Sequence, residues 1–284
     1  MKKTILISLL LSFTATVQGA LVFEEVFNYT PGGGGTGAGS AWDSLSSNGW
    51  TKSTGGANFN LLAGGTNFTA PTLSPFGYSF SEMQVGGNGM DMEKNFGTTI
   101  GNTYFFSYTF ETWSSVAEGT ASGTVRFQTE SGQSFRLGYE GDDTFGIGIG
   151  GTDSTAQASL ANSTTYFVVG KFSVTDNLGT NTGTTWDISA NLYAETAGTN
   201  ILAYSSLPST EPGSWTFTAT GGTGVDNQIV EEISLRASGG PNLLFESIRV
   251  GESYAEVAVP EPSTYALLAG FATLGLVMLR RRMK

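Results

Sequence analysis

The chain has 284 residues, 24 acidic and 13 basic, so its formal net charge is 13 − 24 = −11. It contains no cysteine and no histidine. These absences exclude disulfides, iron–sulfur clusters, thiolate or imidazole catalysis and imidazole-ligated zinc or haem. The acidic balance, and the lack of a basic stripe interleaved with aromatic residues in the middle of the chain, disfavour nucleic-acid binding.

The basic residues gather at the two ends of the chain. Six of them lie within residues 2–3 and 280–284, whereas every acidic residue lies within residues 24–261. The middle of the chain therefore has a net charge of 7 − 24 = −17. Lys and Arg are enriched in the cytoplasmic flanks of membrane segments. The segregation of charge therefore predicts that the export machinery recognises both ends of the chain and that the acidic middle crosses the membrane.

The first twenty residues, MKKTILISLLLSFTATVQGA, have the layout of a secretory signal peptide. Two lysines precede an apolar run, which is followed by small residues at the expected cleavage site. We predict a signal peptide over residues 1–19, with cleavage after Gly19 or, as the second choice, after Ala20. The Sec translocon and signal peptidase are the partners this implies. An uncleaved anchor is disfavoured because the apolar run is shorter than the roughly 20 residues that a membrane span needs.

Residues 20–258 read as one all-β domain. Tyr104, Phe106, Tyr108 and Phe110 alternate with polar residues, as in a strand with one buried face. Similar strands recur at roughly ten-residue spacing, separated by Gly, Ser, Thr and Asn turns, which predicts a single β-sandwich of about twelve strands. The same alternation places two tryptophans in the core, Trp186 and Trp215. In the closing segment LLFESIRV, the apolar residues Phe245 and Ile248 are both expected to face the core although they are three positions apart. This spacing breaks the strict alternation of a strand and predicts a β-bulge.

Two glycine-rich stretches, residues 31–40 and 146–151, satisfy the G-x-G-x-x-G spacing. Neither lies between a strand and a helix, so dinucleotide binding is not predicted. The first reads as a flexible loop. The second reads as a strand whose small face lets another group lie close against it.

The C-terminal stretch, VPEPSTYALLAGFATLGLVMLRRRMK, has three parts over residues 259–284. A Pro-Glu-Pro triplet precedes an apolar helix predicted over residues 263–279, whose length of about 25 Å suffices to cross a thin bilayer. Arg280, Arg281 and Arg282 follow and would hold the terminus in the cytoplasm. The prolines interrupt the helix upstream and leave the triplet extended.

This end resembles the PEP-CTERM sorting signal of exopolysaccharide-producing Gram-negative bacteria. The resemblance covers residues 259–282 and implies that Pro260, Glu261 and Pro262 are recognised by exosortase, a membrane-embedded cysteine protease-transpeptidase. It also implies cleavage near the triplet, with the helix left in the membrane. The alternative is a plain C-terminal membrane anchor that is never processed, because the same apolar helix could serve as a sorting signal or as a permanent anchor.

The opening FEEVFNYTPG and the closing LLFESIRVGESYAEV are similar to the first and last strands of concanavalin-like, LamG-type jelly rolls. That resemblance implies that the two terminal strands pair near one another. The sorting tail would then leave the domain beside the edge of the sandwich.

One acidic cluster has the oxygen ligands that calcium prefers in loops. We expect no cofactor other than calcium, and the candidate ligands are Glu140, Asp142, Asp143 and Asp153. A solvated acidic turn explains the same residues without any metal.

The sequence favours a carbohydrate-binding or structural role over catalysis. Glu111 and Glu130 lie on polar strand faces, but no Glu-x-Asp-x-x-Glu strand signature accompanies them. Trp42, Trp50 and Trp113 lie in loops or out of phase with core positions, so they are candidates for stacking on sugars if their rings are exposed. Core packing is the alternative for all three.

Together these observations predict an exported protein whose precursor is anchored in the inner membrane with its body in the periplasm. Exosortase would then pass it to the cell surface or the extracellular polysaccharide layer, where it serves as a structural or sugar-binding component. The alternatives are a secreted glycosidase or lyase on the same fold and a permanently anchored surface protein.

Overall fold

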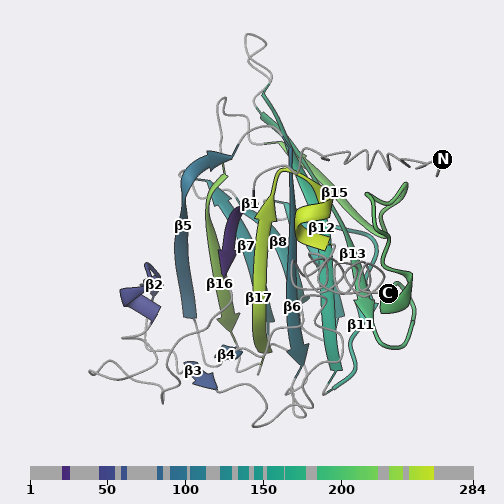
Figure 1. The fold of residues 1–284 in the computed structure, drawn as a ribbon, viewed down its shortest axis with the longest axis horizontal. Helices are drawn as coiled ribbons and strands as arrows, with labels where there is room; N and C mark the ends of the chain where they lie inside the picture. The colour runs from purple at the N-terminus through teal and green to yellow at the C-terminus, as the bar shows by residue number, and fades with distance from the viewer. Residues whose placement is uncertain are drawn as a thin grey trace, which may run out of the picture.

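A computed structural model describes most of the β-sandwich (Figure 1). The described ranges are 21–25, 45–54, 59–62, 82–85, 90–100, 103–112, 122–129, 134–140, 144–149, 152–162, 164–176, 184–222, 230–238 and 243–258. Within them most residues form β-strands, arranged as one nine-stranded and one eight-stranded sheet. The predicted all-β sandwich is confirmed, although it has more strands than expected because several pair over only two residues.

The nine-stranded sheet contains the first and the last described strands, β1 and β17. Its strands are β1 (Leu21–Glu25), β3 (Phe59–Leu62), β4 (Glu82–Val85), β6 (Thr103–Thr112), β12 (Thr164–Asp176), β13 (Thr184–Ala194), β14 (Leu202–Ala203), β15 (Phe217–Gly222) and β17 (Leu243–Gly251). The order across the sheet is β14-β13-β12-β6-β17-β4-β3, with β15 paired to β13 and β1 paired to β17. All of these pairs are antiparallel except β13 with β14.

The eight-stranded sheet is antiparallel throughout its described pairs. Its strands are β2 (Thr51–Thr54), β5 (Met90–Ile100), β7 (Ser122–Thr129), β8 (Ser134–Glu140), β9 (Thr144–Ile149), β10 (Thr152–Asp153), β11 (Ala158–Ser159) and β16 (Val230–Ser238). Their order is β10-β9-β8-β7-β16-β5-β2, and β11 also pairs with β9.

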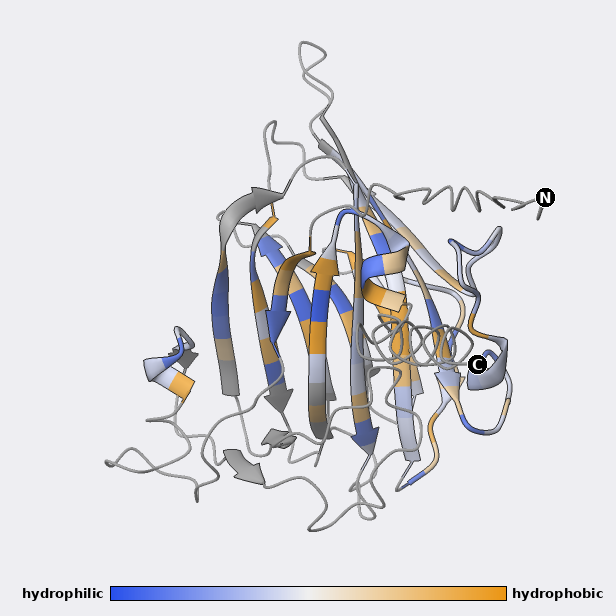
Figure 2. Cartoon of the chain, in the orientation of Figure 1, coloured by the Kyte–Doolittle hydropathy of each residue, from blue (hydrophilic) through white to orange (hydrophobic). Residues whose placement is uncertain are grey.

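The core lies between the two sheets and is rich in aromatic rings. Orange and blue bands alternate along several strands in Figure 2, as expected where one strand face is buried. Phe106 on β6 packs against Phe127 on β7 with ring centroids 5.1 Å apart. Trp186 is 0% exposed and its ring lies 4.8 Å from that of Phe135 in the opposite sheet. The core position predicted for Trp186 is therefore confirmed.

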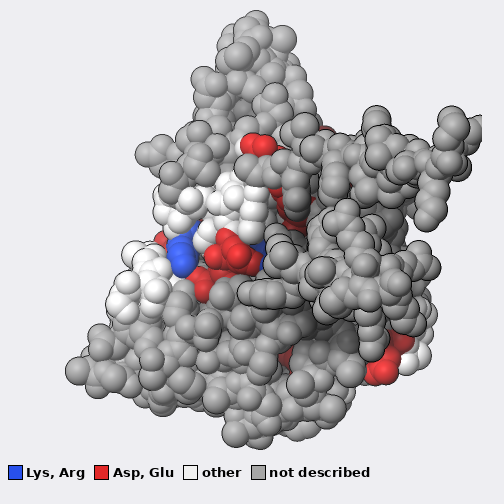
Figure 3. Space-filling view, in the orientation of Figure 1, with Lys and Arg blue, Asp and Glu red and all other residues white. Residues whose placement is uncertain are grey.

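The first and last strands of the sandwich are hydrogen-bonded neighbours. β1 pairs with β17 in antiparallel register, with Glu24 opposite Arg249, and these two side chains form a 2.5 Å ion pair. On the face of the molecule drawn in Figure 3, acidic and basic side chains lie directly beside one another. The register of β17 against β6 shifts between Phe245 and Ser247, which is the predicted bulge. Both the pairing of the terminal strands and the bulge are thus confirmed.

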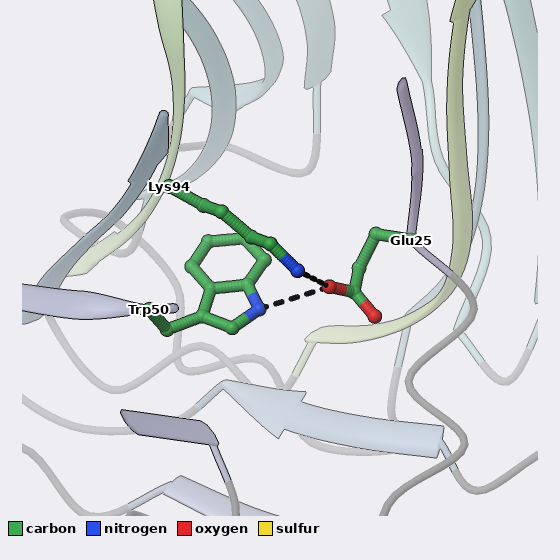
Figure 4. A network of polar contacts seen from close by, with 3 residues as sticks. All are labelled: Glu25, Trp50 and Lys94. Carbon is green, nitrogen blue, oxygen red and sulfur yellow. Dashed lines mark hydrogen bonds and ion pairs between the residues drawn. The ribbon is translucent and has the colours of Figure 1, made fainter. Parts of the chain in front are cut away.

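A buried polar network ties β1 to the other sheet (Figure 4). The Glu25 carboxylate is 3% exposed and accepts hydrogen bonds from Trp50 Nε1 at 3.1 Å and from Lys94 Nζ at 2.6 Å. The Lys94 ammonium also lies 5.7 Å from the centroids of the Phe23 and Trp50 rings. Because buried charges are stable only when paired and hydrogen-bonded, this network fixes how the first strand sits against β5.

Candidate functional site at the end of the sandwich

The last described element is a short helix, α2 (Tyr254–Ala258), which lies on the outer face of the nine-stranded sheet (Figure 1). The sequence resemblance extended the final strand through this segment, but β17 ends at Gly251 and a helix follows. A second apolar cluster forms beneath this helix and comprises Phe105, Phe167, Val169, Tyr193, Tyr254, Val257 and Ala258. Because α2 places three buried side chains on the sheet, it is part of the folded body.

Polar contacts at both ends hold α2 in place. The Ser107 hydroxyl on β6 donates a 2.7 Å hydrogen bond to the carbonyl oxygen of Val257. At the other end of the helix, the Glu256 carboxylate accepts from the backbone N–H of Ser253 at 3.0 Å. A Ser followed three residues later by Glu is the capping-box pattern, in which the Glu side chain reaches back to satisfy an exposed backbone donor. This pattern and the apolar spacing of Tyr254, Val257 and Ala258 are helix signals in the sequence, and the resemblance to a closing strand obscured them.

An aromatic group extends the cluster over the segment that joins β13 to β15. The Trp215 ring lies 6.4 Å from the Tyr254 ring, which in turn lies 6.1 Å from Phe105, both in edge-on geometry. Lys171 forms a 2.5 Å ion pair with Glu211, and its ammonium lies 6.0 Å from the Trp215 ring centroid. Trp215 is half-buried here. The prediction that it joins the core between the sheets is therefore wrong, because the residues before β15 cross the outer face.

The tyrosines of this cluster are held neutral by their surroundings. Burial raises the pKa of Tyr204 to about 12. Burial raises the pKa of Tyr254 further, and the nearby Tyr193 and Glu211 add to the shift. A phenol with such a raised pKa does not act as a base near neutral pH. The cluster is therefore suited to packing and anchoring.

The geometry fixes where the chain leaves the sandwich. Ala258, the last residue of α2, is 0% exposed. The Pro-Glu-Pro triplet begins only two residues later in the sequence. A protein that binds the triplet therefore contacts the chain within a few residues of α2, which is buried and hydrogen-bonded to the sheet.

All of the predicted sorting residues lie outside the described part of the chain. These are the signal peptide over residues 1–19, the helix over residues 263–279, Pro260, Glu261, Pro262, Arg280, Arg281 and Arg282. Among the residues that the structure does describe, no helix has the length and apolar character needed to span a bilayer.

The structure locates one of the three tryptophans predicted to stack on sugars. Trp50 is 1% exposed and donates its indole N–H to Glu25, so it presents no free ring face to a sugar. Trp50 is buried because the turn before β2 places its ring in the core, where its indole N–H reaches Glu25 (Figure 4). Trp42 and Trp113 lie outside the described residues.

The acidic candidates are not all brought together. Glu140 pairs with Thr144 at one end of β9, whereas Asp153 pairs with Gly148 four residues further along that strand. Glu140 on β8 and Asp153 on β10 lie on opposite sides of β9, so their backbones are about 13 Å apart along the strands and about 10 Å apart across them. This separation is too large for both to ligate one calcium ion. Asp142 and Asp143 lie outside the described residues, within which no group of three or more carboxylates has metal-binding geometry.

The two glutamates considered as catalytic candidates do not form a described pair. Glu111 is half-buried at the end of β6 and accepts a 3.2 Å hydrogen bond from the Thr165 hydroxyl of the neighbouring strand. Glu130 lies outside the described residues.

Two findings, one from the structure and one from comparison with known proteins, describe different parts of the chain. The body is an all-β sandwich. Residues 258–282 match the family model of the PEP-CTERM protein-sorting motif. The chain therefore carries the signal of an exported protein that is sorted by exosortase, as the sequence resemblance implied. The match begins at Ala258, the residue at which α2 ends.

No curated protein matches the chain. Several solved structures are similar to this chain at low identity. The cellulose-induced protein Cip1 is 12% identical, with a TM-score of 0.43 over 72% of this chain and 91% of its own. An alginate lyase from Aplysia kurodai is 9% identical, with a TM-score of 0.40 over 82% and 99%. Peanut lectin is 11% identical, with a TM-score of 0.38 over 71% and 96%.

Proposed function

We propose that this protein is a β-sandwich cargo that exosortase cleaves at or near the Pro-Glu-Pro triplet and passes to the extracellular polysaccharide layer. There it acts as a structural or carbohydrate-binding component, and we do not propose an enzymatic activity. Before processing, the precursor is anchored in the inner membrane with its body in the periplasm.

The observation that carries this proposal is the direct junction between a buried anchor and the sorting motif. Ala258 is packed on the sheet, and only four residues separate it from Ser263, where the predicted membrane helix begins. Five residue steps reach at most about 17 Å when fully extended. A membrane-embedded protease would therefore act on the triplet while the folded body lies close to the bilayer.

The experiment compares the full-length chain in a host that contains exosortase with the same host lacking it. Intact-mass spectrometry of the protein reports both termini. We expect the form from the first host to lack residues 280–284 and to begin at Ala20, and the form from the second host to retain its C-terminus. Retention of Arg280 to Lys284 in both hosts would contradict processing.

A matched pair of variants separates the motif from general effects of proline. Pro260→Ala with Pro262→Ala should block processing and leave the body folded. Pro208→Ala with Pro212→Ala, in the segment before β15, changes the same residue type outside the motif and should leave processing intact. Equal processing of both double variants would contradict recognition of the triplet.

A further inference from the structure

The helix α2 is the last described element before the sorting motif, and it depends on the sheet beneath it. Its five residues are too few for a stable isolated helix, because so short a segment cannot offset the cost of nucleation. Tyr254, Val257 and Ala258 are buried on the outer face of the nine-stranded sheet. Residues 254–258 are therefore helical only while they are docked, and a chain that leaves the sheet here also loses the helix.

One side chain of α2 lowers the stability of the docked state. Glu256 is 7% exposed, and its Oε2 accepts the 3.0 Å hydrogen bond from the Ser253 N–H. Its Oε1 is buried and accepts no hydrogen bond from the residues that the structure describes. A buried carboxylate oxygen without a donor has lost its water and gained no partner. This oxygen regains water when α2 leaves the sheet, so release costs less than the buried apolar side chains alone would require.

The docked helix also shortens the chain between the body and the Pro-Glu-Pro triplet. Ala258 and Pro260 are 260 − 258 = 2 residue steps apart, which span at most about 7 Å when extended. Gly251, where β17 ends, and Pro260 are 260 − 251 = 9 steps apart, which span at most about 32 Å. Release of α2 thus increases the reach of the triplet roughly fourfold while β17 stays paired with β6.

The docked state of α2 conflicts with the way a protease binds its substrate. A peptide enters an active site as an extended chain that contacts the enzyme on both sides of the scissile bond. On the amino side of the triplet, Val257 and Ala258 are each 0% exposed. The Val257 carbonyl oxygen is also occupied by its 2.7 Å hydrogen bond from Ser107. An active site cannot surround these residues while they lie against the sheet.

We propose that α2 is an autoinhibitory arm, defined by residues 254–258, whose release from the sheet controls cleavage at the triplet. Docked, the arm holds back cleavage; released, it supplies the extended segment that exosortase binds. The proposal rests on the proposed function, because it concerns the regulation of that same cleavage. The sheets stay paired throughout, so the rate of processing follows the fraction of molecules in which only the arm is open.

The first test locks the arm on the sheet with a disulfide. A Cβ added at Gly251 would lie 3.1 Å from the Cβ of Glu256, slightly closer than the roughly 3.5–4.5 Å of a disulfide, so a small shift accommodates the bond. The chain has no cysteine of its own, so Gly251→Cys with Glu256→Cys introduces the only two thiols. Full-length precursor, purified in a mild detergent from a host without exosortase, is mixed with solubilised membranes that contain the enzyme. Intact-mass spectrometry follows the cleaved fraction with time.

The oxidised form of this double variant should be cleaved roughly tenfold or more slowly than its reduced form, because the bond holds the arm at the end of β17. Both forms have the same sequence, so effects of the two substitutions on folding or recognition are shared. Wild-type precursor under the same oxidising and reducing conditions controls for effects of the reductant on the enzyme.

The second test opens the arm and does not depend on the cysteine variant. Ser107→Ala removes the hydrogen bond to Val257 and should raise the rate of cleavage roughly fivefold, which is the change in an open population expected for one buried hydrogen bond. Ser173→Ala, which removes an exposed contact on the same sheet, should leave the rate unchanged. Hydrogen exchange of the amides in residues 254–258 measures the open fraction directly, and cleavage should rise by the same factor as exchange.

Two results would overturn the autoinhibitory arm and leave the sorting proposal standing. One is equal cleavage of the oxidised and reduced forms, which would place every contact of the enzyme beyond Ala258. The other is a Ser107→Ala variant that exchanges faster in residues 254–258 but is cleaved no faster than wild type. Slower cleavage of Ser107→Ala would likewise overturn it, because the docked helix would then be part of what the enzyme recognises. Absence of any cleavage of the wild-type precursor would overturn both proposals.

Discussion

The hydroxyl of Ser107 and the carbonyl oxygen of Val257 are 2.7 Å apart, although 150 residues separate them in the chain. This hydrogen bond joins a central strand of the nine-stranded sheet to the helix that precedes the sorting motif. It is buried, so both groups lose their water when α2 docks and depend on each other.

Ser107→Ala should lower the local stability of α2 more than it lowers the stability of the sandwich. The substitution leaves the Val257 carbonyl without this donor and costs about 1 kcal/mol. Hydrogen exchange of the amides in residues 254–258 should speed up, whereas exchange in β6 should change little. Ser173→Ala is the control, because the Ser173 hydroxyl makes an exposed contact with Thr103 at 3.1 Å and its loss should be nearly neutral. Unchanged exchange in α2 would show that the apolar contacts alone hold the helix.

Removing the charge of Lys94 should destabilise the whole body. Lys94→Met leaves the Glu25 carboxylate buried without its ammonium partner, which costs about 3 kcal/mol for a buried pair. Lys171→Met breaks a partly exposed ion pair with Glu211 and should cost less than about 1 kcal/mol. Denaturant unfolding of both variants measures the difference. Equal destabilisation by the two substitutions would contradict the special role of burial at Glu25.

Substitution by alanine should destabilise the protein at Gly170 and have little effect at Gly146. A Cβ at Gly170 on β12 would collide with the Ser189 carbonyl oxygen and lie 2.5 Å from the Phe106 ring. Neither the sheet backbone nor the packed ring can retreat, so Gly170→Ala should cost about 3 kcal/mol. Gly146→Ala, in open space, should stay within about 0.5 kcal/mol of wild type. Thermal melting tests the pair, and similar melting temperatures would contradict the close packing of β12 on β13.

Stability should fall in alkaline solution as tyrosines ionise on unfolding. The pKa of Tyr204 is about 12 in the folded body, against about 10 for an unburied tyrosine. The folded state therefore keeps a proton that the unfolded state loses, and stability is full below about pH 10 and declines as the pH rises toward 12. Denaturant unfolding between about pH 8 and about pH 11.5 measures the decline. Tyr204→Phe should make it shallower, and an identical decline in the variant would contradict the burial of this phenol.

Strand faces were predictable because alternation is a local signal. Tyr104, Phe106, Tyr108 and Phe110 repeat with a period of two, and the structure packs that face into the core. The bulge near Phe245 was visible for the same reason, since two inward residues broke the period. The pairing of β1 with β17 came from the resemblance to jelly rolls, because no local pattern joins residues so far apart.

The candidate sites were less predictable because they depend on register and on covering segments. The place of Trp215 on the outer face depends on where the segment before β15 crosses the sheet, which strand alternation does not indicate. Trp50 looked like a loop residue because its partners Glu25 and Lys94 come from two distant strands. The helix signals of α2 were overlooked because the same segment resembles the closing strand of a jelly roll.

Because β1 pairs with β17, the sheet can be completed only after nearly the whole body has been exported. A chain that emerges from a translocon amino end first must hold Leu21–Glu25 unpaired until Leu243–Gly251 has also emerged. Only eleven residues separate the end of this last strand from residue 263, where the predicted membrane helix begins. In the proposed pathway, the last strand and the cleavage signal therefore reach the far side together, and a protease acting at the triplet would release molecules whose final strand is already available for folding.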